Sequence, residues 1–191
     1  GNTVEYREGV FVGYRYYDKK KMQVLFPFGH GLSYTSFEYS NLKLDKKEML
    51  DTDTLTVSVD IKNTGSVAGK EVVQLYVGAP LETEILRPVK ELRGFEKVEL
   101  APGETKTVTF KLCKRAFSYW NTEAHDWRVK SGAYGICIGA SSADIRLCDG
   151  IKVTGTGKLK KNYSLDTILG DVFKDPEAAA VIEHILTNLK S

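Results

Sequence analysis

A mainly β fold, built as a sandwich of two sheets, is predicted by three features of this 191-residue chain. Apolar and polar residues alternate with a period of two over residues 55–62 and again over 105–112, which is typical of strands with one buried face. About seven such short strands are separated by turns rich in Gly, Pro and Asn, as in an immunoglobulin-like sandwich. Strands and helices do not alternate here, which argues against a parallel sheet.

The composition indicates a globular protein and excludes several classes of partner. Hydrophobic residues make up 42% of the chain and charged residues 27%, which is unlike a disordered segment. The formal net charge is only +2 and the Lys and Arg residues are scattered, so we expect no nucleic-acid partner. No run approaches the ~20 apolar residues that span a membrane, so we expect no membrane partner.

The first region, residues 1–35, is irregular and aromatic. Glycines at positions 9, 13, 29 and 31 interrupt any long element. So many aromatic side chains in a short stretch imply burial against another surface. The aromatic residues are Tyr6, Phe11, Tyr14, Tyr16, Tyr17, Phe26, Phe28 and Tyr34.

The second region, residues 36–155, carries the strands of the sandwich. The alternating strand over 55–62 ends at a turn over 63–65, and the strand over 72–77 is apolar on both sides, which predicts a central position. Pro102 and Gly103 mark a turn before the strand over 105–112. The closing strands are expected over 133–138 and 144–153.

The third region, residues 156–191, is expected to be a linker followed by a short helical tail. Ser164 is a candidate cap for a helix over 165–173, and Asp175 with Pro176 marks the start of a second helix. An apolar stripe follows in the second helix, and we favour a role in covering the sandwich over one in binding a partner. Its members are Val181, Ile182, Ile185, Leu186 and Leu189.

Several stretches together resemble glycoside hydrolase family 3. These are residues 6–18 (YREGVFVGYRYYD), 26–35 (FPFGHGLSYT), 63–77 (NTGSVAGKEVVQLYV), 87–95 (RPVKELRGF) and 100–104 (LAPGE). The first is similar to the end of the family's α/β-sandwich domain, and the second to its connection into a fibronectin type III-like domain. The other three are similar to strands and turns of that domain.

The resemblance implies that the chain is an accessory, structural C-terminal part of a β-glucosidase-like enzyme. In such enzymes an Asp nucleophile and a Glu acid/base hydrolyse terminal β-D-glucosides with retention, and both lie in domains that have no match here. We therefore expect the chain by itself to be inactive and to need no cofactor. Its expected partners are those catalytic domains, in cis or as a separate chain, and β-glucosides only through them; a homo-oligomer is left open.

The candidate site residues lie mainly in the aromatic region, where they are expected to form a domain interface or the rim of a pocket. For Glu8 we favour a buried hydrogen-bond anchor over an active-site role, and for Arg15 stacking among tyrosines over a sugar contact. His30 is expected to bond to backbone, and the His spacings support no metal site. The candidates are Glu8, Phe11, Tyr14, Arg15, Tyr16, Phe26, Phe28 and His30.

Trp120 and Trp127 support an alternative function, a free-standing carbohydrate-binding or adhesion module. Exposed tryptophans stack on sugar rings, so the module hypothesis predicts an exposed pair. The accessory-domain hypothesis predicts that both pack under a loop near the edge of the sandwich, and we favour it.

The three cysteines, Cys113, Cys137 and Cys148, fit no zinc spacing. We interpret them as reduced thiols and expect a cytoplasmic protein. A bridge between Cys137 and Cys148 is the less favoured alternative, and it requires the two to lie on neighbouring strands.

Overall fold

The computed structural model describes residues 4, 5, 7–80, 85–157 and 176–188. The chain divides into two compact units, Gly1–Gly157 and Lys158–Ser191. The described part of the second unit is the helix α4 (Pro176–Asn188), which confirms the predicted helix after Asp175. The expected helix over 165–173 and its cap at Ser164 lie outside the described residues. None of the described helices is long and apolar enough to cross a membrane.

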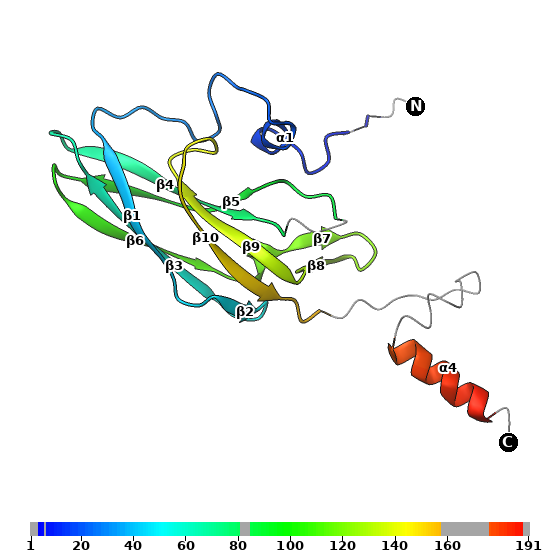
Figure 1. Cartoon of the computed structure of the whole chain (residues 1–191). Coiled ribbons are helices and arrows are strands. Elements are labelled where there is room, and N and C mark those ends of the chain that lie inside the picture. Colours follow the sequence, from blue (N-terminus) through cyan, green and yellow to red (C-terminus); the bar gives the residue numbers. More distant parts are fainter. Residues whose placement is uncertain (1–3, 6, 81–84, 158–175, 189–191) are drawn as a thin grey trace. The chain divides into compact units, whose positions relative to one another are not determined.

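The first unit is a β-sandwich, as predicted (Figure 1). One sheet has the order β1-β3-β6 and the other the order β2-β10-β9-β4-β5, and a separate hairpin pairs β7 with β8. All pairs are antiparallel except β2 with β10. The strands are β1 (Phe37–Leu44), β2 (Glu48–Leu50), β3 (Leu55–Asn63), β4 (Gly69–Gly78), β5 (Glu91–Leu100), β6 (Thr105–Leu112), β7 (Tyr119–Asn121), β8 (Asp126–Arg128), β9 (Gly132–Gly139) and β10 (Ile145–Thr154).

Alternation along the strands builds the core. In β3 the apolar residues Leu55, Val57, Val59 and Ile61 are fully buried, while the residues between them are half-buried or exposed. They pack in one cluster with apolar side chains of the facing sheet. Strand β4 lies between β9 and β5, which confirms its predicted internal position.

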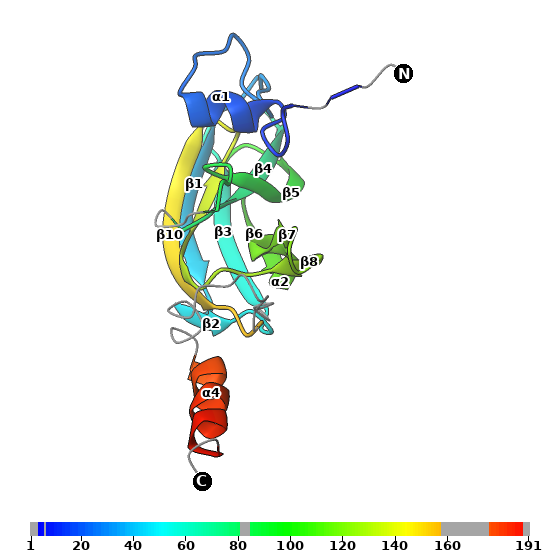
Figure 2. The ribbon, with the colours of Figure 1, turned by 90° about the vertical axis from the view of Figure 1, so that its right-hand side faces the viewer.

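Some short elements were not predicted. The helix α1 (Tyr14–Lys20) lies in the aromatic region, α2 (Lys114–Phe117) follows β6, and β2, β7 and β8 are too short to show a period. Figures 1 and 2 both place α1 at the end of this unit opposite to β2.

Asn63, at the end of β3, is a buried hydrogen-bond hub. Its side-chain amide donates to the carbonyl oxygens of Val67 (2.8 Å) and Leu100 (3.0 Å). Its Oδ1 accepts bonds from the Thr35 hydroxyl (2.6 Å) and the Gly65 backbone N–H (3.0 Å). All four bonding positions of the amide are therefore used, and they join the β3–β4 turn to β5 and to the N-terminal residues.

Replacing Asn63 by Asp should destabilise the sandwich by about 2–4 kcal/mol. The variant loses both donors and places a buried carboxylate against two carbonyl oxygens. Urea denaturation checks this, with Asn121→Asp as the control. Asn121 is only half-buried, and its Oδ1 accepts the Ala124 N–H (2.7 Å), which an Asp can also do, so this variant should lose less than about 1 kcal/mol. Equal losses in the two variants would contradict the hub.

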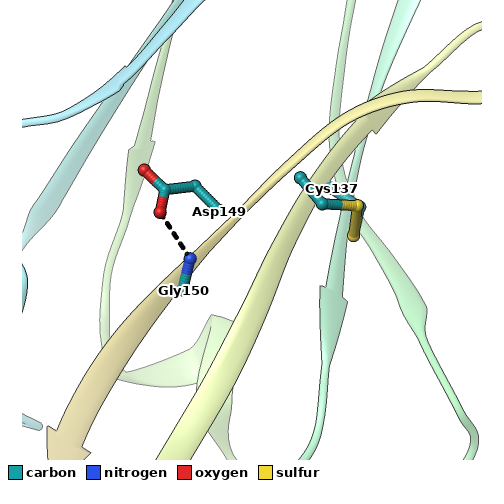
Figure 3. The surroundings of a disulfide bond; sticks show 4 residues. Cys137, Asp149 and Gly150 are labelled. Carbon is teal, nitrogen blue, oxygen red and sulfur yellow. Dashed lines mark hydrogen bonds between the residues drawn. A yellow bond between two sulfur atoms is a disulfide. The ribbon is translucent and has the colours of Figure 1, made fainter.

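The interpretation of the cysteines as reduced thiols is wrong for two of the three. Cys137 of β9 and Cys148 of β10 are direct cross-strand partners with their Cα atoms 4.2 Å apart, and they form a disulfide (Figure 3). The third, Cys113, is free and exposed. The cytoplasmic location was inferred from reduced thiols, so it stays a prediction without that support.

Alkylation of the native chain without reductant should label one cysteine, Cys113, and alkylation after reduction in denaturant should label all three. Intact-mass spectrometry counts the labels. Three labels on the chain before reduction would contradict the disulfide.

Candidate docking site at the N-terminal segment

The N-terminal segment, defined here as the described residues 7–35, is not a free linker. Its helix α1 is preceded by Gly13 and followed by Lys21, which take positive φ values of 61° and 52° respectively. Glycine adopts such a value readily and thereby allows the sharp entry into the helix. The side chain of Tyr14, at the first position of α1, stacks on Phe28 with 4.6 Å between ring centroids.

The segment covers the outward face of β4. Tyr76 and Gln74 point away from the core there, and both are nevertheless buried. The edge of the Tyr76 ring meets Tyr14, with 6.2 Å between centroids. The Tyr76 hydroxyl donates to Gln74 Oε1 (2.6 Å), and Gln74 Nε2 donates to the Gly29 carbonyl (3.1 Å). Gly29 has a φ of 79°, which favours glycine, and a Cβ there would collide with the Gln74 amide.

Three further bonds hold the segment to the sandwich. The backbone N–H of Leu92 donates to the Tyr14 hydroxyl (2.8 Å), and that of Ser142 donates to the Phe28 carbonyl (2.8 Å). Lys90 forms an ion pair with Asp18 of α1 (2.6 Å). The segment is thus fixed by packing, hydrogen bonds and charge at once.

The same segment leaves large apolar side chains in solvent. Leu25 is 94% exposed and Phe26 77%, and Phe28, Leu32 and Tyr34 are also exposed. Two grooves border α1. One, of about 520 Å³, is lined by Tyr14, Met22, Phe26 and Phe28 among others. The other, of about 680 Å³, is lined by Phe11, Tyr16, Tyr17 and basic side chains. An ordered apolar face of this kind is typical of an interaction surface.

The structure brings most of the predicted interface residues together around α1. Phe11, Tyr14, Tyr16, Phe26 and Phe28 line the two grooves. The placement explains why their pattern has no helical or strand period: they serve a surface and not a core.

Glu8, Arg15 and His30 differ in outcome. Glu8 is exposed, so the expected buried anchor is wrong; it lines the same groove as Phe11, and its backbone carbonyl accepts a bond from the Phe11 N–H. Arg15 lies over the Tyr14 ring at 6.0 Å and pairs with Glu91, in agreement with stacking among tyrosines. The backbone N–H of His30 donates to the Pro27 carbonyl, and its ring lies 5.9 Å from that of Phe26.

Trp120 and Trp127 face each other across the β7–β8 hairpin, with ring centroids 5.4 Å apart. They are 47% and 39% exposed, so the prediction that both pack under a loop is wrong. The Arg115 guanidinium covers one face of Trp127, at 3.0 Å from the ring centroid. Phe117, three residues before Trp120, is fully buried in the core.

The chemistry available elsewhere is limited. Within the described ranges no group of three or more His, Cys, Asp or Glu side chains could hold a metal ion. A polar groove of about 540 Å³ beside residues 29–37 contains Glu71, whose Oε1 accepts a 2.7 Å bond from the Tyr39 hydroxyl. Burial raises the pKa of the Glu71 carboxyl, although the Tyr39 bond and the Arg146 charge oppose the rise.

Replacing Glu71 by Gln should therefore stabilise the chain at neutral pH. The folded state binds the Glu71 proton more tightly than the unfolded state, so this stability is present at acid pH and is lost as pH rises through the unfolded and then the folded pKa. We expect the advantage of the variant in free energy of unfolding to grow from about pH 4 to pH 7 and to reach at most about 1 kcal/mol. Urea denaturation at each pH, with the exposed Glu96→Gln as control, measures it; a flat difference would contradict the assignment.

Comparison with known proteins gives consistent matches. The fibronectin type III-like domain family matches residues 71–142. The chain is 54% identical over 188 residues to "Thermostable beta-glucosidase B" of Acetivibrio thermocellus, covering 98% of this chain and 25% of the relative. It is 44% identical over 182 residues to an "Exo-alpha-(1->6)-L-arabinopyranosidase" of Bifidobacterium breve, covering 95% of this chain and 23% of that protein.

A solved structure agrees in fold as well as in sequence. It is a GH3 β-glucosidase from Bifidobacterium adolescentis, with a TM-score of 0.79, 39% identity and coverage of 92% of this chain and 25% of its own. The chain belongs to glycoside hydrolase family 3. It carries the accessory fibronectin type III-like domain of the family and spans about a quarter of the length of these relatives.

Proposed function

We propose that the chain serves a larger family 3 enzyme that hydrolyses terminal β-D-glucosides, and that its N-terminal segment docks on the part of the enzyme that carries the catalysis. The main observation in support is that this segment contains both fixed and exposed apolar side chains. Tyr14 and Phe28 are locked to the sandwich, while Leu25 and Phe26 beside them stand in solvent. A fixed apolar face loses little conformational entropy when a partner covers it.

The docking partner can belong to the same chain or to a separate one, and this part supplies no reacting carboxylate to it. When the partner is absent, the apolar face is free to meet a second copy, so a weak homo-oligomer is expected at high concentration. The cytoplasmic location of the enzyme remains a proposal of the same kind.

A graft tests the docking role. The quarter of the Acetivibrio thermocellus β-glucosidase that matches this chain is replaced by the 191-residue chain. We expect the graft to hydrolyse an aryl β-glucoside, the isolated chain to show no turnover above buffer, and Phe26→Ser to lower the thermal midpoint of the graft but not that of the isolated chain.

The matched control is Leu50→Ser in both proteins, because Leu50 is exposed in β2, at the opposite end of the sandwich from α1. It should leave the graft as stable as the parent graft. If Phe26→Ser and Leu50→Ser behave alike, the segment is not the docking surface. Turnover by the isolated chain would show that the catalytic carboxylates have been misplaced.

A second candidate function is carbohydrate binding, and the exposed Trp120–Trp127 pair favours it. Trp120 has no cation recorded over its ring in the described structure, whereas Trp127 is covered by Arg115. Sugar stacking is therefore expected at Trp120. Isothermal titration of the isolated chain with soluble β-glucan should show binding that Trp120→Ala removes without loss of fold, and absence of heat would reject the module.

A further inference from the structure

Three arginines converge on one carboxylate beneath α1. Glu91, the first residue of β5, accepts a 2.8 Å bond from Arg93 Nη2. Arg15 Nη2 lies 3.4 Å from Glu91 Oε1, and Arg87 Nη2 lies 3.6 Å from Oε2. In the described part of the chain every ion pair of the three arginines ends at Glu91, so the cluster carries two positive charges more than it can pair.

The excess positive charge is energetically costly because most of the cluster is buried. The side chains of Arg87, Glu91 and Arg93 are only 7%, 14% and 18% exposed, and that of Arg15 is 35% exposed. A charge in such a place is costly unless it is paired and hydrogen-bonded. The Nε atoms of Arg15 and Arg93 are buried, and among the described residues neither has a hydrogen-bond partner. Each of these guanidinium groups therefore holds an unused donor.

The geometry is fixed in advance. Arg87 Nη1 donates to the Phe117 carbonyl (3.3 Å), and its guanidinium lies 5.8 Å from the centre of the Tyr119 ring. Arg15 is placed by α1, which is itself held by the Tyr14 contacts. Burial lowers the pKa of the Arg93 guanidinium, and the charges of Arg87 and Arg15 lower it further against the attraction of Glu91.

We propose that Arg15, Arg87 and Arg93 form a binding site for a second carboxylate beside Glu91, supplied by an Asp or Glu side chain from the rest of the family 3 enzyme. Guanidinium groups match carboxylates through paired N–H donors. The site joins α1 to β5, and Arg15 lies over the ring of Tyr14, which lines a groove of the N-terminal segment together with Phe26 and Phe28, so apolar packing and charge pairing would act on one partner. The source of the carboxylate rests on the proposed docking function, whereas the site itself does not.

The test uses the isolated chain and sodium acetate as the probe, at constant ionic strength. The Nε–H signals of the arginines are followed by NMR. We expect those of Arg15 and Arg93 to shift saturably with half-saturation on the order of 10 mM. The signal of Arg146 should stay in place, because both its Nε and Nη2 already donate to Asp144 (2.6 and 2.7 Å). Equal shifts at Arg146, or no saturable shift at all, would overturn the site.

The variant Arg15→Gln separates an anion site from a merely structural arginine. It should weaken the acetate response of Arg93 by roughly tenfold or more. It should also leave the urea midpoint of the isolated chain unchanged or raised, since it removes one of the two excess positive charges of the cluster. Arg146→Gln is the matched control and should keep the acetate response. A strong loss of stability in Arg15→Gln would overturn the proposal.

Two further measurements distinguish the possible sources of the anion. Half-saturation by inorganic phosphate below about 1 mM would assign the site to a free oxyanion and not to a side chain. Glu82 and Glu84, which precede Arg87 in the sequence, lie outside the described residues. If Glu82→Gln with Glu84→Gln moves the Arg15 and Arg93 signals in the absence of acetate, the chain fills its own site and the proposed source is wrong. These signals are independent of Phe26, so the docking role and the anion site can fail separately.

Discussion

The burial of Tyr76 on the outward face of β4 is the constraint on which the N-terminal half of this structure depends. Outward positions of a sandwich strand are ordinarily exposed to solvent, yet Tyr76 is fully buried. Its hydroxyl donates a hydrogen bond to Oε1 of Gln74, which is also buried. Such a face needs a cover with matching polar groups, and Tyr14 with the Gly29 carbonyl provides it. The segment and the sandwich therefore form one packed body, and the exposed apolar side chains beside Tyr14 are held in place by it.

The regular part of the fold could be predicted from sequence because its signal is local. The period of two in β3 predicts which side chain of each adjacent pair is buried. The apolar residues on both faces of β4 predict an internal strand. What covers the outer side of β4 could not be predicted, because the covering residues lie between 45 and 62 positions earlier (Gly29 before Gln74, Tyr14 before Tyr76) and follow no period. The same limit applies to the disulfide: the pairing of Cys137 with Cys148 depends on the register of β9 and β10, which shifts between Ile145 and Leu147.

In the candidate site, some surface features could be predicted from the sequence and others could not. The aromatic content of residues 1–35 predicted an interface, and the structure gathers Phe11, Phe26 and Phe28 around α1. The exposure of individual side chains was harder to predict, because it depends on tertiary neighbours. Glu8 is exposed to solvent, and Trp120 is exposed on the β7–β8 hairpin, whereas Phe117 is buried in the core. The arginine cluster left no recognisable trace, since Arg15 reaches Glu91 only when α1 is docked.

Docking by a preformed face, as proposed above, would allow one accessory part to serve enzymes of different specificity. Two relatives with 54% and 44% identity to this chain bear the names of a β-glucosidase and an exo-α-L-arabinopyranosidase. Substrate choice depends on the groups around the reacting sugar, and function lies in such sites and not in the fold that carries them. Under this proposal, a sandwich that contributes a rigid apolar face and an arginine cluster would stabilise its partner in the same way whatever that partner hydrolyses. The specificity of the enzyme could then change without a change in the docking surface.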